Sequence, residues 1–139
     1  MASITVIEDH PQTARMVAKL LRANGHSVNV WQTGEEGLLK IMELKPDLVL
    51  VDLGLPDIDG QTVIAIIRQQ SHLTSTPIVA FTAWSPETAR EMAKAYGCDG
   101  VITKPIDTRT FARQIETFLH QSLPTDLENE SSSGSQPEK

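Results

Sequence analysis

Short apolar runs rich in β-branched residues alternate five times with longer segments of helical period, and this alternation restricts the fold more than any other feature. Two of the runs, LVLV and IVAF, are apolar at every position, as is typical of strands covered on both faces. Alternating units with short connections predict an α/β fold, a (βα)5 doubly wound parallel five-stranded sheet in a three-layer sandwich. The expected strands are Ile4–Ile7, Ser27–Trp31, Leu48–Val51, Ile78–Phe81 and Gly100–Thr103, and the expected helices are Pro11–Ala23, Gly34–Leu44, Gly60–Gln70, Pro86–Tyr96 and Thr108–His120.

The end of the chain differs in composition from the rest. From Pro124 to Lys139 the sequence holds one Leu, no aromatic residue and otherwise only Pro, Gly and polar or charged side chains. Such a segment buries too little apolar surface to offset the entropy of an ordered chain. We therefore predict one domain over residues 1–122 and a disordered polar and acidic tail over residues 123–139.

Charge and composition exclude several classes of protein. A net charge of −6 argues against a broad interface with nucleic acid. The first residues do not supply a signal-peptide apolar region, and no apolar run approaches the roughly 20 residues of a membrane span. The single Cys98 cannot form an internal disulfide and is interpreted as a packing residue. We expect a cytoplasmic protein with no nucleic-acid or membrane partner.

Reactive side chains follow four of the five expected strands. Glu8 and Asp9 come after the first, Asp52 after the third, Thr82 after the fourth and Lys104 after the fifth. In doubly wound sheets ligands bind outside the carboxyl ends of the strands, near the point where the strand order reverses. The sequence therefore predicts a site at this edge of the sheet.

The residue types at these positions indicate phosphoryl chemistry. Three carboxylates in one crevice repel one another, and Mg²⁺, which prefers oxygen ligands, would relieve that repulsion. Lys104 can pair with the carboxylates or with a phosphoryl oxygen, and Thr82 supplies a hydroxyl donor. A metal, an ammonium group and a nucleophile are the parts that phosphoryl transfer needs, and the central Asp52 is the expected nucleophile.

Over Ser3–Gln121 the chain resembles the receiver domain of bacterial two-component response regulators. The matching motifs are the acid pair in EDH, the segment LVLVDLGLPDIDG, the segment IVAFTA and the segment ITKPI. The order and spacing of all four together are specific to that family. The resemblance implies a flavodoxin-like sheet with strand order 2-1-3-4-5.

The resemblance also implies a function. A sensor histidine kinase or a phosphotransfer protein would give its phosphoryl group to Asp52, with Mg²⁺ held by Asp9, Asp52 and the backbone carbonyl of Gly54. Glu8 would support a metal-bound water. The resemblance implies that Thr82 and Lys104 would hydrogen-bond the phosphoryl oxygens. It also implies a cis peptide bond at Lys104–Pro105. The chain would be a stand-alone response regulator rather than an enzyme acting on other substrates, and a downstream protein partner would read its state.

One position departs from the family pattern. Many family members carry Tyr or Phe three residues before the lysine, where this chain has Val101. Valine has a stiff χ1 and little reach, so a ring cannot report phosphorylation here. The face formed by the fourth helix, fifth strand and fifth helix would instead respond through shifts of backbone and loops.

Several nearby residues have simpler interpretations. His10 is interpreted as an exposed first-turn residue rather than a metal ligand, because imidazole suits zinc better than magnesium. Asp57 and Asp59 are expected to form a turn and a helix cap. Trp84, two residues after Thr82, is expected at the mouth of the site.

Two alternatives stay open at this stage. A receiver-type scaffold that is never phosphorylated also fits the fold: Val101 weighs slightly for it, whereas the complete set of acids with Thr82 and Lys104 weighs against it. A phosphatase of the haloacid dehalogenase type also uses a strand-end Asp and Mg²⁺, but it needs a second Asp two residues later. That position holds Gly54 here, which weighs strongly against the phosphatase.

Overall fold

The computed structural model describes residues 2–121 and confirms the expected architecture. All strands are parallel and lie in one sheet of order β2-β1-β3-β4-β5. The expected tail over residues 123–139 lies outside the described residues. The elements are β1 (Ser3–Ile7), α1 (Pro11–Ala23), β2 (Ser27–Trp31), α2 (Gly34–Leu44), β3 (Leu48–Asp52), α3 (Gly60–Arg68), the 3₁₀ helix η1 (Ser71–Leu73), β4 (Ile78–Thr82), α4 (Pro86–Tyr96), β5 (Gly100–Thr103) and α5 (Phe111–Gln121).

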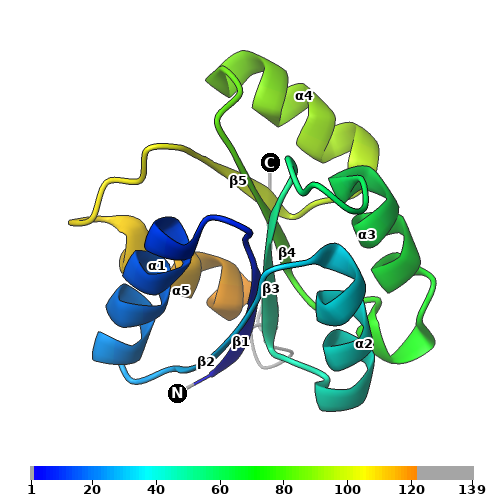
Figure 1. Ribbon diagram of the computed structural model, residues 1–139, viewed down its shortest axis with the longest axis horizontal. Coiled ribbons are helices and arrows are strands. Elements are labelled where there is room, and N and C mark those ends of the chain that lie inside the picture. The colour runs from blue at the N-terminus through cyan, green and yellow to red at the C-terminus, as the bar shows by residue number, and fades with distance from the viewer. Residues whose placement is uncertain (1, 122–139) are drawn as a thin grey trace, which may run out of the picture.

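The sheet is the middle of three layers. Helices α1 and α5 cover one face, and α2, α3 and α4 cover the other (Figure 1). Successive side chains of a strand point to opposite faces, so the apolar strand β3 supplies both layers. Its Leu48 and Leu50 join the cluster under α1 and α5, while Val49 and Val51 join the cluster under α2 and α3. Every residue of β3 and of β4 is buried, which fixes the two strands at the centre of the domain.

The structure corrects the bounds of two helices. The last helix begins at Phe111 rather than Thr108, because the Asp107 side chain accepts a hydrogen bond from the Arg109 amide and holds the preceding residues in a turn. The third helix ends at Arg68 rather than Gln70, and a short 3₁₀ helix that the sequence did not indicate follows it. Both errors lie at helix ends, where local side-chain hydrogen bonds compete with the helical pattern.

Two aspartates of the β3–α3 loop act as caps, on two different helices. Asp59 caps α3, as expected, by accepting a hydrogen bond from the Gln61 amide. Asp57 instead accepts hydrogen bonds from the Gly34 and Glu35 amides, at 2.9 Å and 3.1 Å, and so binds the first turn of α2. The bond from the Gly34 amide is the main reason that the pKa of Asp57 lies below its usual value. This loop is therefore attached to α2 as well as to α3.

Replacing Asp57 with Ala is expected to destabilise the domain by about 1 kcal/mol, the usual cost of losing a helix cap. The two amides at the start of α2 would lose their acceptor. Urea unfolding followed by circular dichroism measures the change. Glu91→Ala, at an exposed position of α4, is the matched control, and equal stability of the two variants would contradict the capping role.

Candidate functional site

The carboxyl ends of the strands bring the expected residues together. Asp52 and Thr82 are the last residues of the adjacent strands β3 and β4, and in the β3–β4 register Asp52 lies opposite Phe81. Glu8 follows β1 directly and Lys104 follows β5 directly. The sequence placed Asp52 and Thr82 just after their strands, whereas both still belong to them. They are consequently held by the sheet itself.

Lys104 joins two buried carboxylates. Its Nζ lies 2.8 Å from Oε1 of Glu8 and 3.3 Å from Oδ2 of Asp52. The side chain of Glu8 is 0% exposed and that of Asp52 is 6% exposed, so neither carboxylate is well solvated. The other oxygen of Asp52 accepts a hydrogen bond of 2.9 Å from the Gly54 amide. The site is thus a buried charge cluster with one cation for two of its acids.

The environment shifts the pKa of both partners. Burial raises the pKa of Asp52, repulsion from Glu8 adds to the effect, and the Gly54 amide and Lys104 oppose it. Burial alone would lower the pKa of Lys104, but the carboxylates of Glu8 and Asp52 outweigh it and raise that pKa. Lys104 therefore stays charged, whereas burial and the nearby Glu8 disfavour the ionised form of Asp52. A bound cation, or a reaction that changes the charge of this carboxylate, would relieve that cost.

The acids also offer a set of oxygens that fits a hard divalent cation. Ligand atoms of Glu8, Asp9, His10 and Asp52 all lie within 4.8 Å of one another. The buried Oδ1 of Asp9 accepts no hydrogen bond from any other residue that the structure describes. A buried carboxylate oxygen without a donor is costly unless a cation supplies the missing interaction. The carboxylates of Asp9 and Asp52, with Glu8 beside them, are therefore suited to Mg²⁺.

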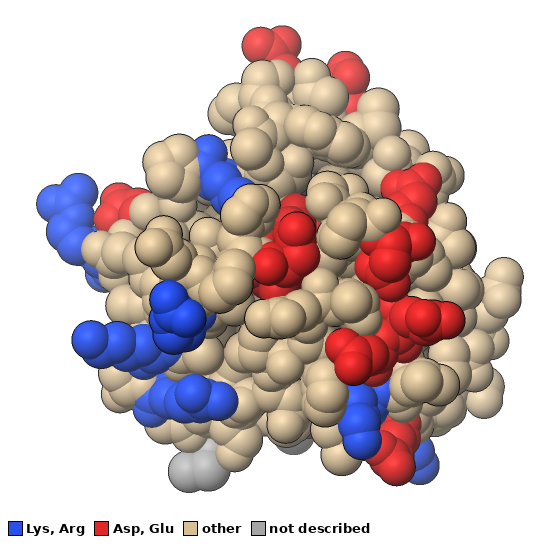
Figure 2. Space-filling view, viewed as in Figure 1, with Lys and Arg blue, Asp and Glu red and all other residues tan. Residues whose placement is uncertain are grey.

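Figure 2 shows how acidic and basic side chains are distributed on the face of the molecule that carries the site. Acidic side chains gather in a hollow near the middle of the view, over the carboxyl ends of the strands. Basic side chains lie on the left, over the face that α1 covers, and further acids lie on the right. The negative charge of the domain is thus partly concentrated at the site.

One residue near the acids was not expected to contact them. His10 is exposed, as predicted, but its Nδ1 lies 3.3 Å from Oε2 of Glu8 and 3.5 Å from Oδ1 of Asp9. The His10 amide also donates to Glu8. The sequence feature that could have indicated these contacts is the position of His10, directly after the acid pair and directly before α1.

Comparison with known proteins agrees with this geometry. Residues 4–116 match the family model described as "Response regulator receiver domain". The chain belongs to the response regulator receiver domain family. Receivers are phosphoacceptor modules of two-component signalling, and histidine kinases are in general their partners. Family membership also rules out the haloacid dehalogenase alternative.

Relatives and solved structures of single receivers match most of this chain and nearly all of their own length. It is 29% identical over 117 residues to the polar-differentiation response regulator DivK of Brucella anthropi, which covers 84% of this chain and 95% of DivK. A putative response regulator from Chloroflexus aurantiacus superimposes with a TM-score of 0.81 at 27% identity, covering 86% of this chain and 98% of that one. The chemotaxis response regulator CheY4 of Vibrio cholerae gives 0.79 at 28% identity, covering 85% and 98%. Among the described helices of the receiver, none has the length and apolar character needed to cross a bilayer.

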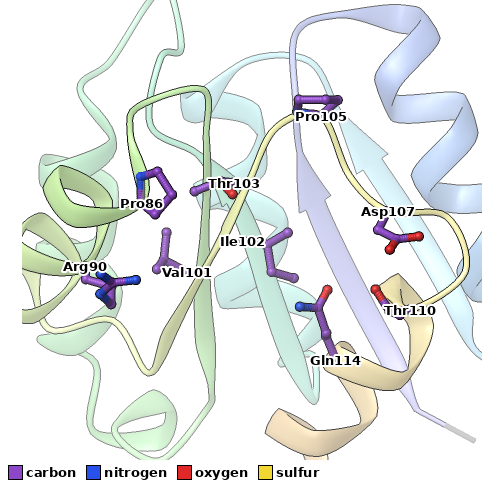
Figure 3. Close-up of a pocket in the computed structure, with 9 residues that line it drawn as sticks. All are labelled: Pro86, Arg90, Val101, Ile102, Thr103, Pro105, Asp107, Thr110 and Gln114. Carbon is purple, nitrogen blue, oxygen red and sulfur yellow. The ribbon is translucent and has the colours of Figure 1, made fainter.

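The remaining predicted residues lie on the side of the site toward α4 and β5. The peptide bond Lys104–Pro105 is cis, as expected. Trp84 is 40% exposed, and its amide donates a 3.1 Å hydrogen bond to Oγ1 of Thr82. Val101 is half-buried on β5 and lines a pocket between α4 and α5 (Figure 3).

Replacing Asp52 with Asn is expected to raise the stability of the metal-free receiver by about 1 kcal/mol, which corresponds to a melting temperature a few degrees higher. The folded-state pKa of Asp52 is raised, so its ionisation above that pKa costs stability, and the gain in the variant should be present at pH 7 and shrink as the pH falls. Thermal unfolding in EDTA at pH 7 and at pH 4 measures it. An Asp52→Asn protein less stable than wild type at pH 7 would contradict this account.

Proposed function

We propose that this receiver is a phosphorylation-dependent switch in which Asp52 accepts a phosphoryl group from a phosphohistidine of a histidine kinase or of a phosphotransfer protein. The observation that supports it most is the placement of the Asp52 carboxylate at a strand end, next to the Lys104 ammonium and the buried Glu8. No purely structural need explains this set of charges, because buried ion pairs rarely stabilise a fold.

In the transfer step an oxygen of Asp52 attacks phosphorus, a P–O bond forms, the P–N bond to the donor imidazole breaks, and the imidazole leaves. The Lys104 ammonium, already 3.3 Å from Oδ2 of Asp52, then pairs with a phosphoryl oxygen. Mg²⁺ held by Asp9, Asp52 and the carbonyl of Gly54, with Glu8 supporting a bound water, would neutralise charge on the transferring group. Water later hydrolyses the acyl phosphate and restores Asp52.

The switch follows from two hydrogen bonds that the new group would change. The Thr82 hydroxyl, which now accepts from the Trp84 amide, turns to donate to a phosphoryl oxygen. A hydroxyl can donate and accept at once, so the Trp84 amide stays bonded to Thr82 only when the loop that leads into α4 moves with the hydroxyl. Lys104, whose amide bonds the Thr82 carbonyl at 2.7 Å, carries the change into the end of β5. The surface of α4, β5 and α5 would then shift toward a state that a downstream protein binds.

Acetyl phosphate with Mg²⁺ tests the proposal, because it supplies the phosphoryl group without a kinase. The intact mass of the wild-type chain is expected to rise by one phosphoryl group, and Asp52→Asn should show no such rise. Asp57→Asn, an acid of the same loop that faces α2 instead, is the matched control and should behave as wild type. Failure of the wild type to take the group even from a cognate kinase would favour the unphosphorylated scaffold.

A further inference from the structure

The β3–α3 loop carries Gly54, the one residue of the proposed metal site that has no side chain to hold it in place. At the start of the loop, the Leu53 amide still bonds the sheet, with its nitrogen 3.1 Å from the carbonyl oxygen of Phe81. At the end of the loop, Asp59 caps α3. The position of Gly54 between these two points depends on what else the loop contacts.

Asp57 supplies the polar contacts of the loop with α2. Its two carboxylate oxygens accept hydrogen bonds from the Gly34 amide at 2.9 Å and from the Glu35 amide at 3.1 Å. Among residues 54–58, and within the part of the chain that the structure describes, no other group hydrogen-bonds an element beyond β3 and α3. A carboxylate at the first turn of a helix is a favourable acceptor, because it meets free amides and the positive end of the helix dipole.

A second contact, independent of hydrogen bonding, joins the same two segments. A Cβ atom added to Gly34 would overlap Cγ2 of Ile58, so glycine at this position lets the loop approach the first residue of α2 closely. Ile58 is half-buried and packs against the apolar cluster under α2 and α3. The loop backbone therefore cannot move away from the acids without separating both Asp57 and Ile58 from α2.

We propose that Asp57 is a positioning residue of the metal site: by binding the first turn of α2 it holds the backbone of Gly54 beside the acids, and so raises the affinity of the receiver for Mg²⁺. Asp57 is not one of the residues whose ligand atoms cluster at the site, so it acts through the loop. Mg²⁺ demands nearly ideal octahedral geometry, and a ligand that is in place for only part of the time lowers the apparent affinity by that fraction. The inference rests on the proposed function, because it concerns the metal on which phosphoryl transfer depends.

The affinity for Mg²⁺ can be measured without any phosphoryl donor, from the rise in melting temperature with Mg²⁺ concentration. Asp57→Ala is expected to weaken that affinity by about fivefold, the factor that corresponds to one lost helix cap transmitted in full to the metal. Asp57→Asn keeps one acceptor oxygen and should lose less. In labelling with acetyl phosphate, Asp57→Ala should need about fivefold more Mg²⁺ for half of its maximal rate, whereas the rate at saturating Mg²⁺ should stay near that of the wild type.

Thr33→Ala is the matched control, because Thr33 caps the same helix. Its Oγ1 accepts a hydrogen bond of 3.2 Å from the Glu36 amide, and within residues 2–121 its hydrogen bonds stay inside the first turn of α2. The variant should therefore lose a similar amount of stability but bind Mg²⁺ as the wild type does. Wild-type affinity in Asp57→Ala, an equal loss in Thr33→Ala, or no binding of Mg²⁺ by the wild type would overturn the proposal. Weakened binding in Asp57→Ala alone, in a receiver that takes no phosphoryl group even from a cognate kinase, would overturn only the proposed function.

Discussion

Replacing Lys104 with Met is expected to lower the free energy of unfolding by about 3 kcal/mol at pH 7 in EDTA, because removing one partner of a buried ion pair leaves an uncompensated charge. Lys104 is the cation within 4.0 Å of both Glu8 and Asp52 in the part of the chain that the structure describes. Met keeps most of the length and apolar contact of the lysine side chain. The loss would therefore come from charge rather than from packing. Urea unfolding at two pH values measures it.

The direction of the pH effect distinguishes this cause from others. Without the ammonium, which lowers the pKa of Asp52, that carboxylate is more easily protonated in the folded state, so the deficit should shrink as the pH falls from 7 toward 5. Adding Glu8→Gln to Lys104→Met should restore much of the stability, because the fully buried carboxylate is then neutral. Lys94→Met on α4 is the control for removing a positive charge. A deficit independent of pH and unchanged in the double variant would rule out the charge explanation.

Replacing Phe81 with Ala is expected to cost about 3–5 kcal/mol, the usual range for a fully buried aromatic residue. Phe81 is 0% exposed on the central strand β4, and its ring lies 6.4 Å from that of Phe111 on α5. The Nζ of Lys104 lies 4.8 Å from the centroid of the Phe81 ring, so the same ring supports the cation of the site. The variant should lose stability and also slow phosphoryl uptake.

Two substitutions separate the two roles of Phe81. Phe81→Leu keeps most of the buried apolar volume but removes the aromatic face under Lys104, so it should cost less stability while still slowing uptake from acetyl phosphate. Unfolding in urea and the rate of the mass shift give the two readouts. If Phe81→Leu is phosphorylated at the wild-type rate, the ring does not help to position Lys104.

Much of the site could be predicted because it depends on topology rather than on detail. Two fully apolar strands require cover on both faces, and parallel strands bring their carboxyl ends to one edge. Asp52 and Thr82 follow from that rule alone, and Lys104 from the end of the fifth run. The predicted ends of β3 and β4 were less accurate, because a buried polar residue at the end of a strand cannot be distinguished from a loop residue in the sequence.

Other features depend on contacts between distant segments and left no local signal. Asp57 lies 23 residues from Gly34, so its cap on α2 could not be read from either segment. The start of α5 was misplaced because Asp107 holds the preceding turn through its own side chain. The pocket at β5 likewise needs α4 and α5 in place. Val101 showed that no aromatic ring occupies this position, but the sequence did not indicate that a pocket lies beside it.

The contact between Asp57 and the first turn of α2 also provides a kinetic probe of the loop after the phosphoacceptor. Hydrogen exchange at the Gly34 and Glu35 amides requires that both bonds to Asp57 open. Asp57 follows Asp52 by five positions along the chain, so fluctuations beside the acid limit the opening. Exchange rates at two amides on a different helix thus measure the mobility of the active loop without a label in it.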